Sequence, residues 1–177
     1  MTSPVNWALL GLLIRKEDYG YRLAQRLERA YGDVLALNSE SHVYTALDGL
    51  TRRGLIEEVR AEPGTKRQPK VRYRASADAL AAYRGWVAEQ GRRGSPLFAR
   101  ALSMLDGAPA VALEILDGYE RDCLQRIAQP ERHASTSAPA GAAERIVAED
   151  QRLAMEGRLP WIEFARGELE ELLGASR

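Results

Sequence analysis

The sequence predicts a mainly α-helical fold with a small β-hairpin, and three observations lead to this prediction. Apolar residues recur at helical spacing over residues 5–52, short strand-like patterns follow at residues 55–60 and 71–75, and helical patterns return after residue 76. The chain of 177 residues is 28% charged and only 7% aromatic, which favours helices over a sheet-rich sandwich. This length allows one large domain or two small ones, each able to bury a core.

Three helices are expected before residue 53. Val5–Ile14 is apolar on nearly every side, so a helix there must be covered all round. A second helix is expected to begin after Asp18, which is a good N-cap, and to run to about Tyr31. The third begins at residue 38 or 39, and Gly54 stands where a left-handed residue would close it.

After Gly54 the period changes from helical to alternating. Leu55–Arg60 and Val71–Ala75 are predicted to be two short strands, and a Pro-Gly pair supplies the turn between them. Three helices followed by such a hairpin are the order of a winged helix-turn-helix domain. A fourth helix from about Ser76 to Gln90 leads out of it. We therefore expect residues 1–90 to form a DNA-binding domain.

Residues 91–177 are predicted to form an α-helical dimerisation domain. Helices are expected after Ser95-Pro96, over residues 109–128 and over residues 142–173 with a break at Pro160, while residues 130–141 are the best linker candidate. Their apolar stripes are too long for about 80 residues to cover, so a twofold homodimer is expected. The predicted dimerisation residues are Leu113, Leu116, Ile162, Leu169 and Leu172.

The net charge of the chain is zero, but the charges are unevenly distributed. Residues 1–90 carry fourteen basic and eleven acidic groups, whereas residues 91–177 carry eleven basic and fourteen acidic groups. Between Arg52 and Arg74, eight basic residues stand against three acidic ones. A nucleic acid responds to such a local basic segment more than to the total charge.

The third predicted helix has the side chains that a major-groove reader needs. Ser39, Ser41, His42 and Thr45 are small or polar and lie near its start, where they can approach base edges. Phosphate contacts are expected from flanking residues of this helix and from the basic loop of the hairpin. The predicted DNA-binding residues are Tyr21, Ser39, Ser41, His42, Tyr44, Thr45, Arg52, Lys66, Arg67, Lys70 and Arg72.

Several of these segments resemble the PadR-like transcriptional regulators. The resemblance lies in Tyr19–Leu23, Ser41–Leu47 with Gly54–Ile56, and Val71–Ser76, and it continues in Ser95–Phe98 and Trp161-Ile162, which are similar to landmarks of the longer subgroup with a helical C-terminal domain. It implies a homodimeric DNA-binding protein, usually a repressor, that leaves a palindromic operator when a small, often aromatic, effector binds.

The chain departs from the family pattern at four positions. Ser41 and His42 stand where the family usually has Gly and Thr, Thr45 replaces a common Pro, and Ala79 replaces a frequent Gly. The base preference of the family therefore does not transfer to this chain.

The remaining motifs indicate an aromatic ligand site and no catalytic chemistry. Flat side chains suit stacking on a planar effector, so the candidate ligand-binding residues are Trp7, Tyr119, Trp161 and Phe164. With a single cysteine and two histidines at unsuitable spacing, we expect no metal site; we also expect no cofactor and no enzyme activity. The longest apolar run is too short to cross a bilayer, and the single cysteine fits a reducing cytoplasm.

Two alternatives remain open at this point. The winged helix could bind a protein in place of DNA, which would abolish the steep salt dependence of phosphate binding. An enzyme built on the helical half is the weaker alternative, because no convergent set of titratable groups is visible in the sequence.

Overall fold

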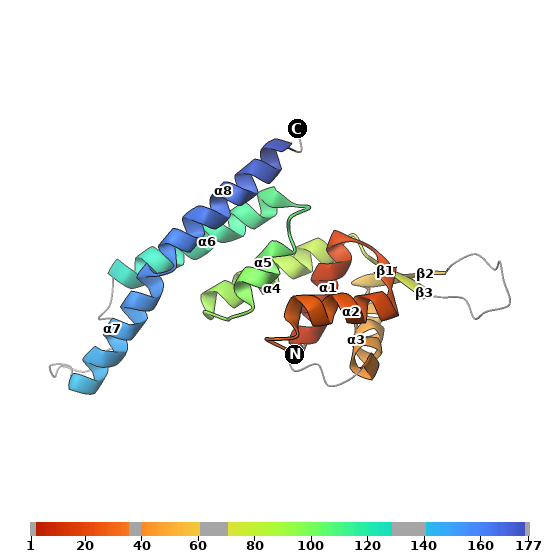
Figure 1. The fold of residues 1–177 in the computed structure, drawn as a ribbon, viewed down its shortest axis with the longest axis horizontal. Helices are drawn as coiled ribbons and strands as arrows, with labels where there is room; N and C mark the ends of the chain where they lie inside the picture. Colours follow the sequence, from red (N-terminus) through yellow and green to blue (C-terminus); the bar gives the residue numbers. More distant parts are fainter. Residues whose placement is uncertain (1–2, 36–39, 61–70, 129–140, 176–177) are drawn as a thin grey trace. The chain divides into compact units, whose positions relative to one another are not determined.

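A computed structural model describes residues 3–35, 40–60, 71–128 and 141–175. It is mainly α-helical and contains a three-stranded antiparallel sheet of strand order β1-β3-β2, as Figure 1 shows, so the predicted fold class is confirmed. The chain divides into two compact units, Met1–Ala108 and Pro109–Arg177. The functional division at residue 90 stays a prediction. The basic loop residues Lys66, Arg67 and Lys70, together with Ser39 and residues 130–140 of the linker candidate, lie outside the described residues.

Helix α1 (Pro4–Arg15) forms the centre of the first unit. Ser3 caps it through its hydroxyl, which accepts from the Val5 amide at 3.3 Å, and Pro4 occupies the first turn, where a missing N–H costs nothing. Every residue of Ala8–Leu13 is buried, and the helix packs against α2, α3, α4 and β3. The all-apolar pattern is thus explained by cover on several sides.

Helices α2 (Gly20–Tyr31) and α3 (Glu40–Arg52) lie beside α1 and precede the strands β2 (Ile56–Arg60) and β3 (Val71–Ala75). The two strands pair antiparallel, with Ile56 opposite Ala75 and Arg60 opposite Val71. A third strand, β1 (Asp18–Tyr19), pairs with the other edge of β3.

Helices α4 (Ala79–Arg92) and α5 (Phe98–Ser103) complete the first unit. Tyr83 of α4 is fully buried and donates its hydroxyl hydrogen to the Ala101 carbonyl at 3.1 Å. Arg100 of α5 donates to the Ala30 carbonyl and pairs with Asp33, so it binds the polar end of α2. These contacts fasten the last segment of the unit to its helical core.

The second unit contains α6 (Pro109–Ala128), α7 (Ala142–Glu156) and α8 (Leu159–Ala175). Helix α6 packs along α8, and Leu116 and Ile162 are fully buried. Arg166 of α8 reinforces this packing by ion pairs to Asp117 and Glu120, the second with an N–O distance of 2.6 Å. The break predicted at Pro160 is confirmed, because α7 ends at Glu156 and α8 begins three residues later.

Three predicted helix starts were wrong. Helix α4 begins at Ala79 and not at about Ser76. The N-cap of α2 is Tyr19, without a side-chain cap, because the Asp18 carboxylate accepts hydrogen bonds from the Tyr19 amide and the Arg26 guanidinium. The helix expected at Ser95-Pro96 begins only at Phe98, and Ser95 accepts from the Leu97 amide within the preceding turn.

Candidate nucleic-acid interface

Helix α3 has one buried and one exposed face. Its apolar residues Val43, Ala46, Leu47 and Leu50 are buried, and the helix contacts α1 and α2. On the rest of the helix, Ser41, His42, Tyr44 and Thr45 are exposed, as predicted for residues that approach DNA. Arg52 is exposed in the last turn, where its Nε donates to the Asp48 carbonyl at 3.4 Å.

The end of α3 fixes the hairpin beside it. Gly54 has φ +69°, a left-handed conformation that glycine adopts without steric cost, and the Leu55 amide then reaches back to the Leu50 carbonyl at 3.1 Å. The Leu55 carbonyl in turn accepts from the Ser76 amide at 3.0 Å, directly after β3. Both ends of the hairpin therefore meet the closing turn of α3.

Tyr44 connects α3 to the start of α2. A Cβ on Gly20 would lie 2.7 Å from Cε1 of Tyr44, so the absence of a side chain at Gly20 lets the ring approach the α2 backbone. The ring is still 43% exposed. Tyr44 therefore presents its outer edge where the N-terminus of α2 and the exposed face of α3 meet.

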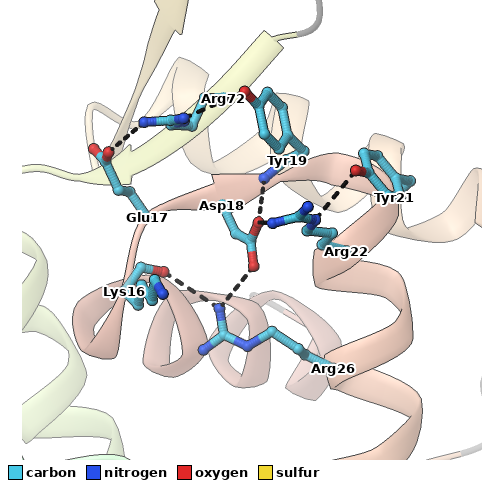
Figure 2. Close-up of polar contacts among 8 residues, drawn as sticks. All are labelled: Lys16, Glu17, Asp18, Tyr19, Tyr21, Arg22, Arg26 and Arg72. Carbon is cyan, nitrogen blue, oxygen red and sulfur yellow. Dashed lines mark hydrogen bonds and ion pairs between the residues drawn. The ribbon is translucent and has the colours of Figure 1, made fainter.

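An aromatic and cationic cluster extends from this point (Figure 2). Arg22 stacks near the rings of Tyr19 and Tyr21, at 5.7 and 5.8 Å from their centroids, and its Nε donates to the Tyr21 hydroxyl at 3.1 Å. The rings of Tyr19 and Tyr21 are themselves 6.0 Å apart. Tyr21 was predicted as a site residue, whereas Tyr19 and Arg22 were missed although they stand in the same motif.

Arg72 belongs to the same cluster but is held by its neighbours. Its guanidinium donates to Glu17 at 2.9 Å and to the Tyr19 hydroxyl at 3.2 Å, as Figure 2 shows. These hydrogen bonds, that to Tyr19 first, raise the pKa of Arg72, so the group remains cationic. Two residues further along β3, Arg74 forms an ion pair with Glu57, its cross-strand partner on β2, with an N–O distance of 2.8 Å. Both strand arginines therefore share their charge with a carboxylate.

Arg26 joins the cluster to α1. One of its terminal nitrogens, Nη1, lies 3.4 Å from both the Asp18 carboxylate and the Lys16 carbonyl (Figure 2). The other, Nη2, donates to the Leu12 carbonyl at 3.1 Å. It thereby adds hydrogen bonds to carbonyl groups at the C-terminus of α1, of which the Leu12 carbonyl also accepts from the Lys16 amide at 3.2 Å. This contact fixes the strand β1, and with it the position of Tyr19.

The four candidate ligand residues fall in both units. Trp7, in the first, stacks on Trp86 with 5.6 Å between ring centroids and 9° between planes. In the second unit, Tyr119 meets Trp161 edge to face at 6.4 Å, and Phe164 is 65% exposed. Trp86 was not predicted, since its own helix gives no signal for the stacking. The ligand site stays a prediction.

Other kinds of site find no support in the described part of the chain. Among its residues, no group of three or more His, Cys, Asp or Glu side chains is placed to hold a metal ion. The helices described there include none with the length and apolar character of a membrane span. Cys123 is buried, and burial raises the pKa of its thiol, which disfavours the reactive thiolate.

In structure the chain is similar to Bacillus subtilis PadR in complex with operator DNA, at 16% identity and a TM-score of 0.45 over 94% of this chain and 99% of that chain. It is also similar to a PadR-like transcriptional regulator from Bacillus cereus, at 14% identity and a TM-score of 0.36 over 94% of each chain. No curated protein shows a significant match to the sequence. Residues 9–78, which run from within α1 to just after β3, match the model of the transcriptional regulator PadR-like family, and this segment of the chain is a PadR-like domain.

Proposed function

We propose that this protein is a dimeric transcriptional repressor that binds a palindromic operator through its first unit and releases it when a small, possibly aromatic, ligand binds. One observation supports the DNA-binding part of this proposal: α3 has an exposed polar face. The opposite, apolar face of α3 is buried in the first unit, and the β2–β3 hairpin follows the helix. A helix of this kind, packed against a preceding helix, is the element that enters the major groove in helix-turn-helix proteins.

The contacts divide into two kinds. We expect Ser41, His42 and Thr45, all exposed on α3, to contact base edges, and Tyr21, Tyr44 and Arg52, also exposed, to contact the sugar-phosphate backbone. The residues Lys66, Arg67 and Lys70 of the hairpin loop would add phosphate contacts that carry little sequence information. Affinity and base preference should therefore respond to different substitutions.

The second unit supports the dimer. Apart from Tyr21 and Tyr44, the large apolar side chains found exposed among the described residues all belong to α6, α7 or α8: Leu124, Ile146, Val147, Leu153, Phe164 and Leu172. Covering such side chains is the usual reason for a twofold interface. Of the predicted dimerisation residues, Leu116, Ile162 and Leu169 are already buried within one chain, Leu113 is half-buried, and Leu172 is 41% exposed.

A dimer would place two α3 helices about 34 Å apart, one turn of DNA, and would favour a palindromic site. An effector that changes how the units are held would change this separation. The aromatic pairs Trp7–Trp86 and Tyr119–Trp161 are the places where we expect a planar effector to act.

DNA binding is tested by fluorescence anisotropy with the duplex upstream of the gene and with a scrambled duplex, at several salt concentrations. Tighter binding to the native duplex with a steep salt slope is expected. Lys66→Ala or Arg67→Ala should weaken binding to both duplexes and lower the salt slope by about 1, while His42→Ala should change the preference between them. Arg93→Ala, which removes the same charge from the end of α4, is the control and should change neither.

Equal, weak binding of both duplexes would contradict the proposal and favour the protein-interaction alternative.

The dimer is tested by sedimentation equilibrium of Ile146→Asp, which places a charge on a side chain that is 70% exposed. If Ile146 lies in the interface, Ile146→Asp should lower the dimer fraction. The control variant Ala110→Asp, at an exposed position of α6, should leave the dimer fraction unchanged. An undisturbed dimer in the Ile146 variant would exclude this face.

A further inference from the structure

The hydroxyl group of Thr45 is used inside the protein. Thr45 is the sixth residue of α3, on its exposed face and in its second turn. The Thr45 hydroxyl donates to the Ser41 carbonyl, four residues earlier, with an Oγ1–O distance of 3.0 Å. Threonine makes such a bond when its hydroxyl turns back along the helix. The single hydrogen of this hydroxyl is then unavailable to a base.

We propose that Thr45 is a specificity residue that selects thymine by contact between the Thr45 methyl group and the 5-methyl group of the base. This proposal rests on the proposed DNA-binding function. Position 45 lies in the half of α3 that meets base edges when such a helix enters the major groove. The hydroxyl group of Thr45 is bound to the helix backbone, whereas its methyl group is left to contact a base.

The chemistry of base edges narrows the partner. Guanine presents two acceptors in the major groove, N7 and O6, and needs a donor, which Thr45 in this geometry does not offer. Thymine presents a methyl group, which an apolar contact can recognise. Thr45 therefore favours a thymine over a guanine.

The experiment separates the methyl from the hydroxyl. A duplex library with a randomised centre is selected with the wild-type protein, and each thymidine of the selected duplex is replaced in turn by 2′-deoxyuridine, which lacks the 5-methyl group. Losing one methyl contact corresponds to about a fourfold loss of affinity. We expect a loss of this size at one thymidine in each half-site and no measurable loss of affinity at the other thymidines.

Two variants assign the effect to Thr45. Thr45→Ser keeps the hydroxyl and removes the methyl, so it should bind about fourfold more weakly and be insensitive to deoxyuridine at that position. Thr45→Val keeps the methyl groups and the β-branched shape, so it should retain the full deoxyuridine penalty. The far-UV circular dichroism of both variants should match that of the wild type.

The outcomes also distinguish this proposal from the function on which it rests. If the wild type selects no common sequence, the proposed function itself fails. If it selects one, but Thr45→Ser shows the same deoxyuridine penalty as the wild type, operator binding stands and the role of Thr45 is refuted. A guanine selected opposite Thr45, lost in Thr45→Val, would refute it as well.

Discussion

Replacing Gly11 by alanine is expected to destabilise the first unit, although alanine is the better helix former. Gly11 lies in the middle of α1, and a Cβ built on it would be 2.4 Å from the Tyr83 hydroxyl oxygen and 2.7 Å from Cζ of the same ring. The ring cannot move away easily, because Tyr83 is fully buried and its hydroxyl is bonded to the Ala101 carbonyl.

The magnitude follows from two opposing effects. Forcing an extra methyl group into a packed core costs about 1–3 kcal/mol, and alanine gains about 1 kcal/mol over glycine in a helix interior. Because two contacts would fall well below van der Waals distance, the upper part of that range applies, and a net loss of about 1–2 kcal/mol is expected. Gly85 of α4 is the matched control, since nothing lies within 4 Å of a Cβ there. Gly85→Ala should stabilise the protein by about 0.5–1 kcal/mol.

Urea unfolding at one fixed protein concentration measures both variants, because a dimer makes stability depend on concentration. Tryptophan fluorescence reports on the stacked Trp7 and Trp86 of the first unit and on Trp161 of the second, and circular dichroism follows the whole chain. Tyr83→Phe removes the nearest clashing atom, so it should cost less in the Gly11→Ala background than in the wild type. If Gly11→Ala were as stabilising as Gly85→Ala, the close packing of α1 on Tyr83 would be disproved.

Three further predictions concern a turn, an ion-pair group and a buried phenol. Gly54→Ala should cost about 1 kcal/mol in urea unfolding, because its φ of +69° is strained for any residue with a Cβ. Arg166→Leu should lose about 1 kcal/mol at low salt and less at high salt, because its partly exposed pairs with Asp117 and Glu120 are screened. Burial raises the pKa of Tyr119 from 10 to about 12. The folded state then holds the phenol proton of Tyr119 more tightly than the unfolded state does. The stability that this group contributes is therefore complete below pH 10 and is lost as the pH rises towards 12. A phenolate absorbance titration in which every tyrosine ionises near pH 10 would contradict this prediction.

The elements that the sequence predicted correctly are those with strong local signals. The stripe of Val43, Leu47 and Leu50 predicted both α3 and its buried face, and Gly54 predicted its end. The alternation of Val71, Tyr73 and Ala75 predicted β3 with its correct bounds. Each of these patterns depends only on neighbours along the chain.

What the sequence missed depends on partners far along the chain. Strand β1 has only two residues, which is too short for an alternating pattern, and it exists because Asp18 and Tyr19 pair with Tyr73 and Arg72. The same tertiary contacts overrode the capping preference of Asp18. Leu116 and Ile162 carried the helical spacing expected of an interface, yet spacing alone does not tell an interhelical contact within one chain from a contact between two chains.

The ion pairs of the first unit lead us to expect that DNA affinity and base specificity come from different elements. Arg22, Arg72 and Arg74 each have a carboxylate within 4 Å, so much of the positive charge around the sheet and the start of α2 is already compensated. The hairpin loop, by contrast, has Lys66, Arg67 and Lys70 in its sequence against a single acidic residue. Phosphate attraction is therefore expected to come mainly from the loop, and its loss should lower binding to every sequence alike. The exposed face of α3 is nearly free of basic side chains before Arg52. Substitutions there should change which sequence is bound while leaving the salt slope almost constant.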